Sequence, residues 1–158
     1  MNKKIMYIYP PFCSPTNPPY NLYSLPSLIK ANSDYDVEVM DLNLKLHKAR
    51  IKNPFNNFEN YNTRAKRFFD DCGNLYKEIN EKIRDEEKNL PQISEFIELI
   101  KKQDPDYIVF SVIYNQQLFY AIRLAREFKN KIKPAIGGPA VNPGLATHFD
   151  FVSNDILK

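Results

Sequence analysis

The sequence YIVFSVIYNQQLFYAIRLAREFKNKIKPAIGGP, residues 107–139, decides the fold of this chain. Its first part, residues 107–113, is rich in β-branched and aromatic side chains and predicts a strand. Apolar residues then recur at helical spacing over about residues 116–129, and residues 133–139 predict a short strand that ends in two glycines. A strand, a helix and a second strand in this order predict a βαβ unit with parallel strands.

The sequence before this unit continues the alternation of strands and helices. Residues 5–9 predict a strand that is buried on both faces, and residues 37–42 predict a second strand nearer the edge of the sheet. Between them, about residues 23–32 have helical spacing, with Asn21 or Ser24 as a candidate N-cap. This part of the chain therefore predicts a second parallel unit.

A helical insertion of about residues 44–103 separates the second predicted strand from the third. Residues 44–60 lack periodicity, and KNPFNNFENYN, residues 52–62, predicts a loop, whereas about residues 63–88 predict a long amphipathic helix. The apolar stripe of that helix comprises Ala65, Phe68, Phe69, Cys72, Leu75, Tyr76, Ile79 and Ile83. A further helix is predicted at about residues 92–102 and ends before Pro105.

These elements predict an α/β fold: a Rossmann-like (flavodoxin-like), doubly wound, parallel five-stranded sheet within one domain, residues 1–158. The last strand is expected at residues 149–152. Ligands of such sheets bind at the carboxyl ends of the strands, where the strand order reverses. If the order is 2-1-3-4-5, the candidate site comprises residues 10–20, 111–116 and 137–143.

The amino-acid composition of the chain argues against some classes of binding partner. The 158 residues are 43% hydrophobic and 26% charged, and the net charge of +3 comes from a mixture of both signs. There is no clustered basic stripe, so nucleic acid is not an expected partner. No apolar run is long enough for a membrane span, and the N-terminus has no signal-peptide pattern. A cytoplasmic protein without a membrane partner is therefore expected.

The loop YPPFCSPTNPPYN, residues 9–21, follows the first predicted strand and has five prolines and no glycine. Proline has no N–H, so this loop offers few backbone donors to a phosphate group. Flavin or nucleotide binding is therefore supported only by fold analogy. Cys13 is interpreted as a small loop residue rather than a nucleophile, and His47 and His148 as surface histidines without metal-ligand spacing.

Two features at other strand ends have a structural and a functional interpretation. Ser111 interrupts an apolar strand, where its hydroxyl either bonds to the backbone or binds a polar edge of a ligand. Gly137 and Gly138 either form a tight turn or allow close approach of a ligand to the backbone, and adjacent glycines in a chain with only four favour the second interpretation.

Several short segments follow one another along the chain: YPP and PPY after the first strand, VEVMDLN, PDYIVFSV, LAREFK, AIGGPAVNP and FDFV. In this order they resemble the cobalamin-binding domain found at the N-terminus of B12-binding radical SAM proteins. Cobalamin domains have the signatures DxHxxG, SxL and GG. Ser111-Val112-Ile113 is similar to the second and Gly137-Gly138 to the third, whereas PPFCSPTNPPY replaces the first. The resemblance therefore implies a corrinoid bound without a lower histidine ligand, with its dimethylbenzimidazole tail near Ser111, Gly137 and Gly138.

The resemblance further implies part of a methyltransferase or of a peptide- or natural-product-modifying enzyme, with no catalytic residue and no metal ligand in this domain. The implied cofactor-binding residues are Pro11, Phe12, Cys13, Ser111, Val112, Ile113, Tyr114, Gly137, Gly138 and Pro139. Phe12 and Tyr20 are expected to offer a flat apolar surface to the corrin ring.

The chain contains no CxxxCxxC motif, which holds the [4Fe–4S] cluster in radical SAM domains. The [4Fe–4S] cluster and S-adenosylmethionine are therefore expected only in a downstream radical SAM domain that is absent from this chain. That domain is expected to act in cis or in trans. VSNDILK, residues 152–158, also differs from the GEGE-like turn of the family. The alternative is a degenerate Rossmann-like domain that has lost its cofactor and serves as an interaction or substrate-recruiting module. Bulky Phe12, Tyr20 or Tyr114 side chains filling the crevice above Gly137 and Gly138 would favour it.

Overall fold

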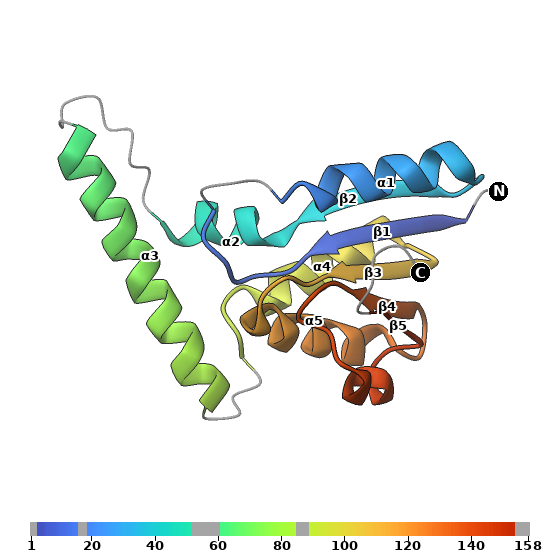
Figure 1. Ribbon diagram of the computed structural model, residues 1–158. Coiled ribbons are helices and arrows are strands. Elements are labelled where there is room, and N and C mark those ends of the chain that lie inside the picture. The colour runs from blue at the N-terminus through green and yellow to red at the C-terminus, as the bar shows by residue number, and fades with distance from the viewer. Residues whose placement is uncertain (1–2, 16–18, 52–60, 85–88, 154–158) are drawn as a thin grey trace.

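The computed structural model describes residues 3–15, 19–51, 61–84 and 89–153, and its centre is a five-stranded parallel sheet (Figure 1). The strands are β1 Lys4–Tyr9, β2 Asp36–Asp41, β3 Tyr107–Ser111, β4 Lys133–Gly137 and β5 Phe151–Ser153. Their order is β2-β1-β3-β4-β5, and every neighbouring pair is parallel. The predicted flavodoxin-like fold is confirmed, and the reversal of strand order lies between β1 and β3.

Helices cover the two faces of the sheet unequally. The helical elements are α1 Asn21–Asn32, α2 Leu42–Arg50, α3 Tyr61–Arg84, α4 Ile93–Gln103, α5 Asn115–Phe128 and the short 3-10 helix η1 Pro143–Thr147. In Figure 1, α1 lies on one face beside β1 and β2, whereas α4 and α5 lie on the other face. The larger hydrophobic core is under α4 and α5, and a smaller cluster lies between α1 and the sheet.

The helix α2 was not expected, because residues 44–60 lack apolar periodicity in the sequence. The loop predicted at residues 52–62 is wrong for residues 61 and 62, which begin α3, and residues 52–60 lie outside the described residues. Asp41 caps the helix, since its carboxylate accepts a hydrogen bond from the backbone N–H of Leu44 at 2.7 Å. Leu42 and Leu46 are fully buried, so packing stabilises a helix whose own periodicity is weak.

The start of α1 also differs from the sequence interpretation. The helix begins at Asn21 after Tyr20, and no side chain forms a cap hydrogen bond there. The Asn21 amide instead reaches across to β3, where Nδ2 donates to the Ser111 hydroxyl at 2.7 Å. Pro26 is buried inside the helix. Asn21 thus connects α1 to the carboxyl end of a neighbouring strand rather than capping its own helix.

The long helix α3 stands at the end of the sheet where the strands terminate (Figure 1). The prediction of an amphipathic helix is confirmed over Tyr61–Arg84, and Gly73 does not interrupt it. Leu75 and Ile79 are 4% and 0% exposed and belong to the main core, whereas Phe69 is 60% exposed. Only the second half of the helix is therefore packed on the core.

Within the part of the chain that the structure describes, no helix has the length and apolar character needed to cross a membrane.

Candidate functional site

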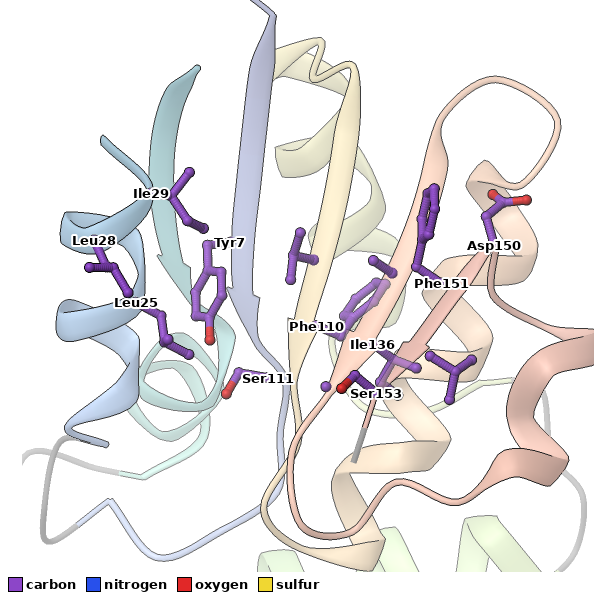
Figure 2. Close-up of a pocket in the computed structure, with 14 residues that line it drawn as sticks. Tyr7, Leu25, Leu28, Ile29, Phe110, Ser111, Ile136, Asp150, Phe151 and Ser153 are labelled. Atoms are coloured by element: carbon purple, nitrogen blue, oxygen red, sulfur yellow. The ribbon is translucent and has the colours of Figure 1, made fainter. Parts of the chain in front are cut away.

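A pocket of about 630 Å³ lies between α1 and the last three strands, on the face of the sheet that α1 only partly covers (Figure 2). The parallel register aligns its floor in two rows. One row consists of Tyr7, Val109, Ala135 and Phe151, and the row nearer the strand ends consists of Ser111, Gly137 and Ser153. The wall is formed by three apolar residues of α1, Leu25, Leu28 and Ile29.

The small side chains on the floor of this pocket project little into it. Ala135 and Gly137 lie at its centre, between β3 and the edge strand β5. Phe151 on β5 is 58% exposed and Leu28 on α1 is 54% exposed, although both line the pocket. The pocket is therefore an open apolar groove, flat enough to accept a planar group.

The end of the pocket nearest the strand termini is polar. Ser111 is 3% exposed, and its hydroxyl accepts the hydrogen bond from Asn21. The Tyr7 phenol points toward Ser111 in Figure 2, and burial raises the pKa of this phenol. Among the described residues, the Asn21 Oδ1 atom is buried and has no hydrogen-bond partner. Asn21 is not among the residues that line the pocket, and a buried acceptor without a partner is unfavourable.

Gly137 and Gly138 have different surroundings. Gly138 has φ of 127°, and a Cβ there would lie 2.0 Å from the Val112 carbonyl oxygen. Its glycine requirement comes from the chain's own backbone, which corrects the expectation that a ligand approaches at this residue. A Cβ at Gly137 would meet only the Ser153 carbonyl oxygen at 3.6 Å, an ordinary contact. Gly137 is thus the glycine that keeps the pocket open.

The loop after β1 does not present its aromatic ring as predicted. Phe12 is 6% exposed and stacks on His47 at 5.0 Å between ring centroids, with Tyr76 of α3 at 5.5 Å. Phe12 is therefore a core residue, and the prediction that it offers a surface to a corrin ring is wrong. Tyr20 is 85% exposed. The apolar character of Phe12 outweighs its position in a loop because α2 and α3 pack over it.

His47 is also buried, in contrast to its interpretation as a surface histidine. It is 4% exposed, and its Nδ1 lies 2.7 Å from the Asn43 carbonyl oxygen. Its Nε2 is buried and has no hydrogen-bond partner among the described residues. Burial lowers the pKa of His47, so the neutral ring is favoured. His148 follows η1 and is only partly exposed.

Cys13 is held by its neighbours as an inert thiol. Its Sγ lies 3.2 Å from the Tyr9 hydroxyl, and Asn43 Nδ2 donates to it at 3.3 Å. Its backbone N–H donates to Asn43 Oδ1 at 3.0 Å. Burial raises the pKa of the Cys13 thiol, which disfavours the thiolate needed for nucleophilic attack. Neither cysteine forms a disulfide.

Gln117 organises the rim of the site and was missed from the sequence. It is fully buried, and its Oε1 accepts hydrogen bonds from the backbone N–H groups of Ile113 and Tyr114 at 2.8 and 3.0 Å. Its Nε2 donates to the Pro10 carbonyl oxygen at 2.8 Å. This one side chain joins the loops that follow β1 and β3. The sequence signal for this role was a glutamine in the first turn of α5. Side chains in the first turn of a helix often form hydrogen bonds with the backbone that precedes the helix.

The structure brings only part of the predicted site together. Ser111 and Gly137 line the pocket, and Val112 contacts Gly138 behind it. The other predicted residues lie around the rim or in the core: Pro11, Phe12, Cys13, Ile113, Tyr114 and Pro139. The residues missed from the sequence are Tyr7, Asn21, Ala135, Ser153 and Gln117, whose roles depend on strand register and on a helix start that periodicity did not locate.

No group of three or more His, Cys, Asp or Glu side chains suited to a metal ion occurs in the described ranges. Comparisons with protein-family models, curated proteins and solved structures found no match.

Proposed function

We propose that this chain is the cobalamin-binding domain of a radical SAM enzyme, of the methyltransferase or peptide- or natural-product-modifying type, and that it binds the corrinoid without a lower histidine ligand. The proposal rests on the pocket between α1 and the strand ends. The small residues Ala135 and Gly137 form its floor, and Ser111 provides a polar group at one end. It lies beside the reversal of strand order, where doubly wound sheets bind ligands.

The pocket suits the planar dimethylbenzimidazole tail of cobalamin. Ala135 and Gly137 leave room for a flat ring, and Val109 and Phe151 supply apolar contacts on either side of Ala135. The Ser111 hydroxyl lines the pocket and offers a polar contact to a hydroxyl or amide group of the nucleotide or of the corrin side chains. The corrin would then lie against the rim, where Tyr114 is 51% exposed and Pro139 is also exposed.

In this proposal the chain's own residues bind and orient the cofactor rather than react. Bound cobalamin would supply a strong cobalt nucleophile for methyl transfer, and this chemistry belongs to the cofactor. The [4Fe–4S] cluster and S-adenosylmethionine belong to a radical SAM domain, in cis or in trans, with which this domain would form the complete active site. We place the protein in the cytoplasm, where its two free thiols remain reduced.

The alternative of a degenerate interaction module has less support. It required Phe12, Tyr20 or Tyr114 to fill the crevice above Gly137 and Gly138. None of these three lines the pocket: Phe12 packs on His47, and Tyr20 and Tyr114 are 85% and 51% exposed. The described residues leave the crevice open, so we retain cofactor binding as the leading function.

Gel filtration of the purified chain with hydroxocobalamin tests the proposal. We expect the wild-type chain to elute with the visible absorbance of the corrinoid, and Gly137→Val to lose it because a branched side chain fills the floor of the pocket. Gly73→Val is the matched control, since nothing lies within 4 Å of a Cβ at Gly73. Circular dichroism checks that both variants are folded.

Two outcomes would contradict the proposal. One is the absence of coelution at high micromolar concentrations of wild-type chain. The other is equal retention of cobalamin by folded Gly137→Val, which would remove the pocket from the binding site.

A further inference from the structure

The apolar face of α3 continues beyond the part that packs on the domain. Its positions 65, 68, 72, 75 and 79 alternate spacings of three and four residues, the pattern of a coiled-coil seam. Leu75 and Ile79 are buried in the main core. The first half of the seam, Ala65, Phe68 and Cys72, belongs to neither core cluster of the described residues. We call these three residues, with Phe69, the α3 seam.

The α3 seam has the composition of an interface centre. Phe68 and Phe69 contact each other edge to face at 5.6 Å between ring centroids, and Phe69 is 60% exposed. Phe68 is half-buried, so Phe69 is the exposed aromatic residue of the pair, and aromatic side chains are enriched at the centres of protein interfaces. In Figure 1 this half of α3 extends away from the sheet.

The charges beside the seam favour a second copy of this chain as that partner. Arg64 and Asp71 are seven residues apart, so they lie on the same side of the helix, with Phe68 midway between them. If two α3 helices pair antiparallel around a two-fold axis near Phe68, Arg64 of each copy faces Asp71 of the other. One surface is then complementary to itself in both shape and charge, as a two-fold interface requires.

We propose that the chain forms a two-fold dimer by antiparallel pairing of the α3 seam, with Phe68 and Phe69 at its centre and two Arg64–Asp71 ion pairs beside it. This inference does not depend on cobalamin binding. The contact spans about two and a half helical turns, so the interface is small and the dimer is expected to be weak rather than permanent.

Sedimentation equilibrium of the full chain, from low to high micromolar concentration, tests this dimer. The wild type is expected to shift from monomer to dimer, whereas Phe69→Lys stays monomeric at every concentration. Lys77→Glu is the control, because Lys77 is an exposed residue of the same helix on the side away from the seam. It should dimerise like the wild type, and circular dichroism should show equal helix content in all variants.

Charge exchange identifies the arrangement. Asp71→Arg and Arg64→Asp each place like charges opposite one another in the homodimer, so each should weaken dimerisation by about tenfold or more. A mixture of the two variants restores opposite charges at both pairs and should form heterodimers. The Arg64→Asp/Asp71→Arg double variant should dimerise like the wild type.

The proposal is overturned if the wild type is monomeric at high micromolar concentration, in which case the seam is covered by another part of this chain or by a different protein. It is also overturned if the mixed single variants associate no better than either variant alone. Retention of hydroxocobalamin is measured on the same samples, so loss of dimerisation and loss of cofactor binding are recorded separately.

Discussion

At the scale of single residues, Gly137 and Gly138 are adjacent but are glycines for different reasons. Gly138 combines a positive φ with a close approach by the Val112 carbonyl, whereas Gly137 has room for a Cβ and faces the pocket. From the sequence, both had been interpreted as one feature that admits a ligand. The backbone conformation separates them, because only a residue without Cβ adopts the geometry at Gly138 without strain.

Gly138→Ala is expected to destabilise the fold by at least about 2 kcal/mol, since the new Cβ would overlap the Val112 carbonyl and the φ is unfavourable for alanine. Gly137→Ala should change the free energy of unfolding by about 1 kcal/mol or less, because its Cβ makes only an ordinary contact. Chemical denaturation of the two variants measures the difference. Equal losses would show that the turn relaxes around a Cβ at Gly138.

At the scale of elements, α2 shows how packing overrides a weak local signal. Its sequence has no clear apolar periodicity, but Leu42 and Leu46 reach the core and Asp41 caps the first turn. The same helix supplies His47, whose ring stacks on Phe12 of the loop after β1. The neutral imidazole is therefore part of the contact that holds this loop in place.

Stability is expected to fall as the pH falls below about 6.5, the ordinary pKa of histidine. The pKa of His47 is lower in the folded chain, so in this range the unfolded chain binds a proton that the folded chain does not. His47→Gln removes this contribution, so its free energy of unfolding should change less between about pH 7.5 and about pH 5.5.

His148→Gln is the control for this experiment. The pKa of His148 is also lowered, but its ring is far less buried, so most of the wild-type pH dependence should remain. Denaturant titrations at both pH values measure the change. If His47→Gln retained the full wild-type dependence, other titrating groups would be responsible.

At the scale of the whole molecule, the sequence alone predicted the architecture of the sheet but only part of the candidate site. Alternating strands and helices predicted the parallel sheet, because buried parallel strands are continuous apolar runs with helices between them. Ser111 and Gly137 were predicted as site residues, and both line the pocket. Tyr7, Asn21 and Gln117 were not predicted, since their positions depend on register and on side-chain contacts across about a hundred residues of sequence.

The connection made by Gln117 spans the molecule and has a measurable effect on stability. Gln117→Leu keeps the side-chain volume but leaves two N–H groups and the Pro10 carbonyl without their partner, so a loss of at least about 2 kcal/mol is expected. Gln116→Leu is the matched control. Within the described ranges its amide donates to the exposed Tyr76 hydroxyl, so a change within about 0.5 kcal/mol is expected by thermal or chemical denaturation. A similar small loss for both would contradict the assigned role.

The Gln117 amide also affects how much order the rim would gain on binding the proposed ligand. Because it already fixes Ile113, Tyr114 and Pro10, little conformational entropy would remain to be lost on binding. We expect the amide protons of Ile113 and Tyr114 to exchange slowly because of these bonds, although Tyr114 itself is exposed. Hydrogen exchange of the free chain measures this, and slow exchange at both residues would show a rim that is preorganised before any ligand binds.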